Sequence, residues 1–162
     1  MSTILPPIPR FVFTIFEPVA LVAGWLSPTF FPEHFVNSQL PNSTSAWATS
    51  AWPTTHVLAL QLGNVYGLLA MIGVGILYQT TEPKVVRNFL VACAVADVGH
   101  LYVTYAVMGG KEYFDVGHWN AMGWGNIGVT AGLLITRLLY FVGAFGDDLV
   151  VDSMKDALKK NA

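Results

Sequence analysis

The chain has 162 residues, of which 54% are hydrophobic and only 11% are charged. A soluble domain usually carries about 25% charged residues, so the composition excludes an ordinary soluble domain and indicates an integral membrane protein. The formal net charge is −2 and no basic block occurs, which gives no indication of a nucleic-acid partner. The single cysteine, Cys93, excludes a disulfide framework and a cysteine metal site.

Four apolar windows approach the roughly 20 residues that a hydrocarbon core about 30 Å thick requires. They predict membrane-spanning helices over residues 11–31, 56–78, 85–108 and 124–145. The segment 32–55 is rich in Ser, Thr, Asn and Pro, 79–84 is a short turn, and 109–123 is rich in Gly and Trp. Because no internal repeat occurs, residues 1–162 are predicted to form one all-α domain, a four-transmembrane-helix bundle.

The distribution of Lys and Arg sets the expected orientation. If all four helices span, only Lys111 lies on one side, and the other side holds Arg10, Lys84, Arg87, Lys155, Lys159 and Lys160. The positive-inside rule then places both termini and the tail 146–162 in the cytosol, and the loop 32–55 in the lumen. The glycosylation sequon at Asn42 is compatible with this topology, and we expect a multi-pass protein of the endoplasmic reticulum.

Three charged residues lie inside the apolar windows: Glu17, Asp97 and Arg137. An ionised side chain inside a bilayer costs about 2.5–3.5 kcal/mol on insertion scales, so it is normally paired and normally marks a site. At 1.5 Å per residue, the three lie roughly 9, 15 and 12 Å from the cytosolic side, which is one layer within the uncertainty of the helix ends. Pro18 follows Glu17 and cannot donate a backbone N–H, so a perturbed helix is expected at the acid.

Helical periodicity groups further polar residues with this layer. On the third helix Cys93, Asp97, His100 and Thr104 share a face, and on the fourth helix one face carries Asn126, Thr130, Leu133, Arg137 and Tyr140. On the second helix Gln61 and Asn64 are one turn apart, and Tyr66 points off their face and carries less weight. Because lipid cannot satisfy polar groups, we expect these faces to turn inward toward a shared cavity.

Small and aromatic residues complete the expected packing. Glycines predict close approach of helices at Gly63, Gly67, Gly73, Gly75, Gly125, Gly128 and Gly132. The aromatic residues near the helix ends are typical of an interfacial belt and include Trp47, Trp52, Tyr113, Trp119 and Trp124. No HExxH motif occurs, and His34, His56 and His118 lack ligand spacing, so neither a metal nor another cofactor is expected.

Two carboxylates beside one arginine suit acid–base chemistry. The arginine can hold one carboxylate ionised while the other, in apolar surroundings, keeps its proton. Such a pair can protonate an oxygen or alkene and also activate water, as in soluble epoxide hydrolases of the limonene-epoxide type, which use a similar acid–Arg–acid set on another fold. Gln61 and Asn64 suit positioning of a water or a substrate oxygen. Two structural alternatives are that Arg137 reaches the cytosolic headgroups, or that it forms only a structural ion pair with Asp97.

Four motifs carry a family resemblance: FEPV, QLGNVYGLLA, ADVGHLY and HWNAMGWGNIG. With them the chain resembles a family of small four-helix fungal membrane proteins, some encoded beside polyketide and terpenoid biosynthetic genes. More distantly it is similar to the sterol isomerase superfamily and to membrane-bound fungal terpene cyclases and epoxide hydrolases. The resemblance implies a polar signature comprising Glu17, Gln61, Asn64, Asp97, His100, Trp119, Asn120, Trp124, Asn126 and Arg137. The residues expected to bind substrate or water at the same site are Gln61, Asn64, Tyr66, Trp119, Asn120, Trp124, Asn126 and Tyr140.

These observations lead to one hypothesis and two alternatives. The chain is predicted to be a membrane enzyme that opens, hydrolyses or cyclises an epoxide on a lipophilic polyketide or terpenoid. Asp97 would be the base, Arg137 would orient it, Glu17 would donate the proton, and His100 would tune or replace Asp97; the two carboxylate roles could be exchanged. The alternatives are a double-bond isomerase or terpene cyclase, and a non-catalytic lipid-binding or scaffolding protein. The oligomeric state is left open.

Overall fold

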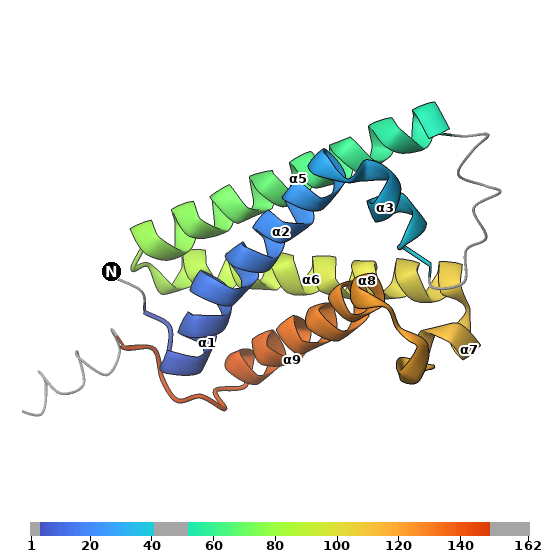
Figure 1. The fold of residues 1–162 in the computed structure, drawn as a ribbon. Helices are drawn as coiled ribbons and strands as arrows, with labels where there is room; N and C mark the ends of the chain where they lie inside the picture. The colour runs from blue at the N-terminus through green and yellow to red at the C-terminus, as the bar shows by residue number, and fades with distance from the viewer. Residues whose placement is uncertain (1–3, 41–51, 150–162) are drawn as a thin grey trace, which may run out of the picture.

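A computed structural model describes residues 4–40 and 52–149 of the chain. Within these ranges every regular element is helical and no strand occurs, which confirms the all-α prediction (Figure 1). The sequon residue Asn42 and the tail 150–162 lie outside the described residues, so the predictions made for them stay predictions. The first and last described residues lie together, because the backbone N–H of Leu149 donates to the carbonyl of Ile4 at 2.8 Å.

The first predicted span forms one helix from Pro7 to Phe30, built from α1 (Pro7–Phe11), η1 (Val12–Phe16) and α2 (Glu17–Phe30). It begins four residues earlier than predicted because prolines fit the first turn, where a backbone N–H has no helical partner. The segment η1 is a π-helix that ends directly before Glu17 and Pro18. The perturbation expected at Pro18 therefore takes the form of a wider helical turn.

Tyr78 stabilises this perturbed turn from the end of the next long helix. In an α-helix the carbonyl of Thr14 would accept from the N–H of residue 18, which proline lacks. The Tyr78 hydroxyl donates to that carbonyl at 2.8 Å and supplies a donor from another helix. Since lipid offers no replacement for a missing backbone donor, this contact joins the helices and satisfies the backbone at once.

The second and third spans are α5 (Trp52–Gln79) and α6 (Pro83–Met108), joined by a short turn. The segments predicted as loops also contain helices, namely α3 (Pro32–Asn37), α7 (Gly110–Tyr113) and η2 (Val116–His118). The fourth helix is continuous through α8 (Ala121–Gly123), the π-helix η3 (Trp124–Val129) and α9 (Thr130–Phe141). It ends before residue 145 because Gly143 and Gly146 take positive φ angles of 77° and 89°, which a helix does not contain.

Three helices are long and apolar enough to cross a membrane: Pro7–Phe30, Pro53–Gln79 and Pro83–Met108. The chain is therefore a multi-pass membrane protein by length and composition. The fourth helix is less apolar because it carries Asn126, Arg137 and several glycines. It forms as predicted, and its spanning of the membrane stays a prediction.

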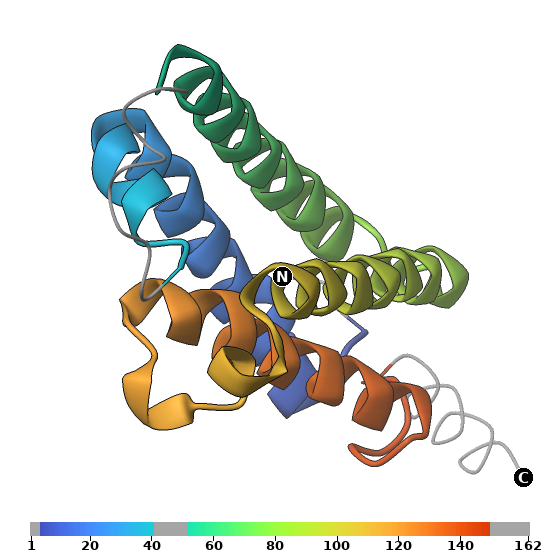
Figure 2. The same cartoon turned by 90° about the vertical axis from the view of Figure 1, so that its right-hand side faces the viewer.

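The long helices associate in two pairs, α2 with α5 and α6 with α9 (Figure 1). Turned by 90°, α5 and α6 run apart from the turn that joins them (Figure 2). Near that turn the pairs come together around a hydrophobic core comprising Ile4, Leu5, Phe13, Leu77, Val86, Leu90 and Leu133. This core lies at the end of the molecule that holds both described chain ends.

The α2–α5 contact is built from small residues. The buried face of α5 carries a residue of this kind every third or fourth position: Ala59, Gly63, Gly67, Ala70 and Gly73. A Cβ added at Gly63 would lie 2.7 Å from Cγ of Pro28, and one added at Gly67 would lie 3.2 Å from the Trp25 ring. Helices that approach this closely in lipid gain van der Waals contact, as expected for these glycines.

The same expectation is wrong for other glycines. A Cβ added at Gly75, Gly125 or Gly132 would meet nothing within 4 Å, and at Gly128 it would meet Trp124 of the same helix. Gly75 lies on the face of α5 opposite to α2. Composition alone does not reveal which glycines face a neighbouring helix.

Candidate active site

Arg137 of α9 joins two carboxylates from two other helices. Its Nη1 donates to Oδ2 of Asp97 on α6, and its Nη2 donates to Oε1 of Glu17 at the start of α2. The Arg137 side chain is 0% exposed, whereas those of Glu17 and Asp97 retain 11% and 13%. The structure thus brings together the three charges that the sequence places in one layer, and it excludes the alternative in which Arg137 reaches the headgroups.

Apolar and aromatic groups surround the guanidinium. Its Cζ lies 5.1 Å from the centre of the Phe13 ring, which is a cation–π contact in apolar surroundings. Among the described residues the buried Nε atom has no hydrogen-bond partner. The Nε–H donor of Arg137 is therefore unused, while the charge itself is paired on two sides.

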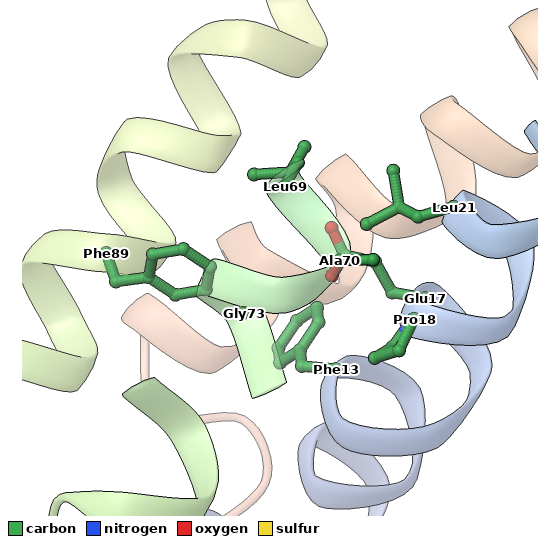
Figure 3. Close-up of a pocket in the computed structure, with 8 residues that line it drawn as sticks. All are labelled: Phe13, Glu17, Pro18, Leu21, Leu69, Ala70, Gly73 and Phe89. Carbon is green, nitrogen blue, oxygen red and sulfur yellow. The ribbon is translucent and has the colours of Figure 1, made fainter. Parts of the chain in front are cut away.

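A pocket opens beside Glu17 between α2, α5 and α6. The Glu17 side chain extends from α2 toward α5, and Phe89 extends from α6 toward Gly73 (Figure 3). The remaining walls are apolar and are formed by Phe13, Pro18, Leu21, Leu69 and Ala70. Asp97, His100 and Arg137 do not line this pocket, so Glu17 is the member of the charged layer that a molecule in it would meet.

The hydrophobic core lies between the charged layer and the part of the molecule where the first and last described residues meet. Ile4, Leu5 and Leu90 are 0% exposed, and Phe13 packs with them directly below the guanidinium. Such close-packed apolar groups leave no polar path for water. The charged layer is thus closed on that side, and the pocket gives it access from the flank of the bundle.

His100 lies one turn beyond Asp97 on the inward face of α6. Its Nε2 atom is buried and without a hydrogen-bond partner among residues 4–40 and 52–149. The face predicted for α6 is correct. Its members Cys93, Asp97, His100 and Thr104 are buried or half-buried, whereas most of the residues between them are exposed. No contact joins His100 to Asp97 in this part of the chain, so its role beside the carboxylate stays a prediction.

The expected inward orientation of Gln61 and Asn64 is wrong. Both side chains are exposed on the face of α5 that points away from α2. Tyr66, to which the sequence gives less weight, is half-buried and packs against Gly24 of α2. The physical reason is that the small residues of α5 allow the closest approach to α2, so this face of α5 packs against α2. The two amides then lie on the opposite face.

Four other candidates form a separate group at the far end of the fourth helix. Asn120 caps α8 by accepting from the N–H of Gly123 at 2.8 Å, and it donates to the carbonyl of Ser38 at 3.0 Å. Asn126 donates to the side-chain oxygen of Gln39 at 2.9 Å. These contacts fasten the end of α3 to α8 and η3.

Two tryptophans complete that group. The rings of Trp119 and Trp124 meet edge to face at 5.1 Å, and the buried Nε1 of Trp119 has no partner among the described residues. At 1.5 Å per residue, Asn120 lies roughly 25 Å along the helix from Arg137, and Asn126 roughly 16 Å. The expectation that this group shares one site with Arg137 is therefore wrong in geometry.

Tyr140 and His118 have partners of their own. The Tyr140 hydroxyl donates to Oδ1 of Asp148 at 2.9 Å, near the end of the fourth helix. The exposed His118 contacts Asp115 at 2.8 Å, and this hydrogen bond raises the pKa of the imidazole above its usual value. Within residues 4–40 and 52–149, no three His, Cys, Asp or Glu side chains gather as metal ligands would.

Sequence reasoning missed the apolar part of the site. Phe13 precedes Glu17 by one helical turn, and this spacing could have indicated that it packs beside the same partner. Phe89, Leu69 and Ala70 carried no such signal, because an apolar residue in an apolar helix is expected at any position. Gln39 and Tyr78 were also missed as hydrogen-bond partners from distant segments.

The apolar helices and the buried charges define a multi-pass membrane protein with an Arg-linked pair of carboxylates inside the bundle. The chain belongs to a family described as a domain of unknown function (DUF7704), whose model matches residues 2–147. The match covers the whole charged layer, the pocket and all three candidate spans. Neither a curated protein nor a solved structure matches the chain.

Proposed function

We propose that the protein is a membrane-embedded acid–base enzyme that opens an epoxide on a lipophilic substrate, by hydrolysis or by internal cyclisation. The observation that carries this proposal is the fully buried Arg137 between Glu17 and Asp97, with Glu17 at the wall of an apolar pocket. A single polar residue is enough to fix helix register, so three charged groups from three helices exceed what that purpose needs.

Charge balance supports different protonation states for the two acids. One arginine and two ionised carboxylates would leave a buried net negative charge, which is costly in surroundings of low polarity. One bound proton removes that cost and makes the cluster neutral. Glu17 is the better place for this proton, because it lines the apolar pocket and Asp97 does not. Asp97 then remains the ionised partner of Arg137.

The proposed reaction uses these two states. Glu17 gives its proton to the epoxide oxygen while the C–O bond breaks, and an oxygen nucleophile forms the new C–O bond from the opposite face of the carbon. Asp97, which does not line the pocket, accepts through a bridging water the proton that the nucleophile loses. With water as nucleophile the product is a vicinal diol; with a hydroxyl of the substrate it is a cyclic ether alcohol. Transfer of the proton from Asp97 to Glu17 through water restores the starting state.

The substrate class follows from the pocket. Seven of its eight lining residues are apolar, and all eight lie within the three candidate spans. These walls match a lipophilic polyketide or terpenoid epoxide in polarity, in line with the resemblance to membrane proteins of secondary metabolism. The space between them is only about 10 Å³, so the helices must part to admit such a substrate. This substrate would enter from the bilayer, and we propose the endoplasmic reticulum as its location.

A double-bond isomerase is the second candidate, and one observation favours it. Glu17 is the only carboxylate among the eight described residues that line the pocket. One acid is enough to protonate an alkene carbon and then to remove a proton from a neighbouring carbon, which moves the double bond with no net gain of atoms. In this reaction Asp97 would only hold the charge of Arg137.

Product analysis distinguishes the candidates. The full chain in native membranes is incubated with lipophilic epoxides and with terpenoid alkenes in water enriched in heavy oxygen. A labelled diol indicates hydrolysis, an unlabelled cyclic ether indicates cyclisation, and a shifted double bond indicates the isomerase. Glu17→Gln and Asp97→Asn are expected to lower epoxide turnover by about 10² or more while the protein stays inserted.

The matched control is Glu33→Gln, which makes the same chemical change on the exposed α3. It should keep the turnover of the parent. If Glu17→Gln and Asp97→Asn both match this control, the cluster is not catalytic, and the protein is better described as a lipid-binding or scaffolding protein. A shift of the alkene double bond that is lost in Glu17→Gln and kept in Asp97→Asn would favour the single-acid isomerase.

We also propose that all four helices span and that both termini face the cytosol. Arg10, Lys84 and Arg87 lie at the end of the bundle with both described chain ends, and Lys111 lies in α7 at the opposite end (Figure 1). A cysteine at Ser45 should be labelled from the lumen and one at Asn161 from the cytosol. Labelling of both from one side would contradict four spans.

A further inference from the structure

The face of α5 that points away from α2 carries a regular stripe of exposed residues. The stripe comprises Val57, Gln61, Asn64, Leu68, Met71 and Gly75. Steps of four and three residues alternate along its whole length, which is the heptad spacing of a coiled-coil seam. Val57 is 57% exposed, Leu68 49% and Met71 68%, so no other described part of the chain covers this seam.

Two amides interrupt the apolar stripe at membrane depth. Gln61 and Asn64 lie inside the candidate span Pro53–Gln79, and neither has a hydrogen-bond partner among the described residues. Hydrocarbon cannot supply partners for the donors and acceptors of an amide. Amides in such positions drive association of membrane helices, because a second helix can satisfy them.

We propose that this stripe is a homodimer interface in which α5 pairs with α5 of a second copy. Two copies in one membrane share the same orientation, so a two-fold axis along the membrane normal places equal residues opposite each other. Asn64 would then meet Asn64 of the partner subunit, and Gln61 would meet the partner subunit's Gln61. An amide carries both donors and an acceptor and therefore complements itself.

The two amides are what identify a second copy as the partner. A second α5 in the same membrane carries Gln61 and Asn64 at the same depth, and each amide complements an identical one. At Gly75 an added Cβ would meet nothing within the chain, which leaves room for close approach of a second helix. A single polar layer in an apolar seam also fixes the register of a pair.

The interface is separate from the proposed active site. The pocket is lined by Ala70 and Gly73 on the opposite face of α5 and by Glu17 of α2. The dimer therefore does not depend on the proposed chemistry.

Disulfide cross-linking tests the seam. In a Cys93→Ala chain in native membranes, Met71→Cys should form a dimer on mild oxidation. Val95→Cys on α6 is the matched control, because Val95 and Met71 are both 68% exposed. A strong dimer from position 71 and little from 95 supports the interface. Equal cross-linking at both, or none at 71, overturns it.

Counting subunits in dilute liposomes tests the amides. Two-step photobleaching should dominate for the parent protein, and Gln61→Leu combined with Asn64→Leu should weaken dimerisation by about tenfold or more. Asn88→Leu, an exposed asparagine on α6, is the control and should leave the dimer intact. A monomeric parent, or a double variant that dimerises as tightly as the parent, overturns the proposal.

Discussion

The two helix pairs of this protein are held together by different means. Between α2 and α5 the contact is close and apolar, with Gly63 and Gly67 placed against Pro28 and Trp25. Between α6 and α9 the buried link is the ion pair of Asp97 and Arg137. The first contact depends on shape, and the second depends on charge balance in a medium that does not solvate charge.

The charged pair is the one that a purely structural role explains least well. Glycine packing already holds α2 to α5 without any desolvated charge. Replacing a buried ion pair by apolar groups is often neutral or stabilising, so stability alone does not explain the presence of this pair. Glu17 adds to this difference, because it extends the charge network from α9 to the first pair.

The largest effect is expected from removing the cation. Arg137→Leu leaves two carboxylates without their partner, and loss of one member of a buried pair costs about 3–5 kcal/mol. Adding Asp97→Asn should recover much of this stability, because one protonated Glu17 then leaves no unpaired charge. The measurement is a double-mutant cycle of unfolding free energy on detergent-solubilised protein.

The control for this cycle is Arg87→Leu, which removes an exposed arginine 5.8 Å from the Phe141 ring. Its cost should stay at about 1 kcal/mol or less. Strictly additive destabilisation by Arg137→Leu and Asp97→Asn would show that the two residues are not coupled. In that case the α6–α9 pair would not be held together by charge, and it would not differ in this respect from the α2–α5 pair.

An intermediate effect is expected in the glycine-packed pair. Gly63→Ala places a Cβ 2.7 Å from Cγ of Pro28, so the helices must move apart at a cost of about 1–3 kcal/mol. Gly99→Ala on α6 meets nothing within 4 Å and should be neutral or slightly stabilising. Thermal unfolding of both variants in lipid discs gives the comparison. Equal stability of the two would mean that α2 and α5 are not packed this closely.

The smallest effect concerns Tyr78, which links α5 to the π-helical turn. Tyr78→Phe removes the donor to the Thr14 carbonyl and should cost about 1–2 kcal/mol, since that carbonyl is then unsatisfied. Tyr102→Phe is the control, because Tyr102 is 68% exposed. Hydrogen exchange of the backbone amides of residues 16, 17, 19 and 20 should rise in the first variant only. No change in either quantity would argue against the bond.

The charged layer could be predicted from sequence, because it follows from the depth of each residue in its apolar window and from the free-energy cost of a charge in lipid. Glu17, Asp97 and Arg137 each stand out in apolar windows, and their distances from the helix ends agree. The faces of α6 and of the fourth helix followed from periodicity. The first helix begins earlier than predicted, because its start depends on prolines whose effect is local.

The rest required three-dimensional information. Polarity shows that Gln61 and Asn64 need partners, but it does not show on which side of α5 the partners lie. The face was decided by Ala59, Gly63 and Gly67, whose contacts are with a helix distant in sequence. The pocket walls are apolar residues among many similar ones, and the bond between Gln39 and Asn126 joins segments 87 residues apart.

The position of the pocket at membrane depth has a consequence for measured kinetics. Its opening lies between three candidate spans, while the hydrophobic core closes the end of the bundle below the charged layer. A ligand that reaches Glu17 by this route is governed by its mole fraction in the bilayer, not by its concentration in water. For the proposed enzymatic reaction, diluting the membrane with inert lipid at constant total substrate should therefore raise the apparent KM in proportion to the added lipid.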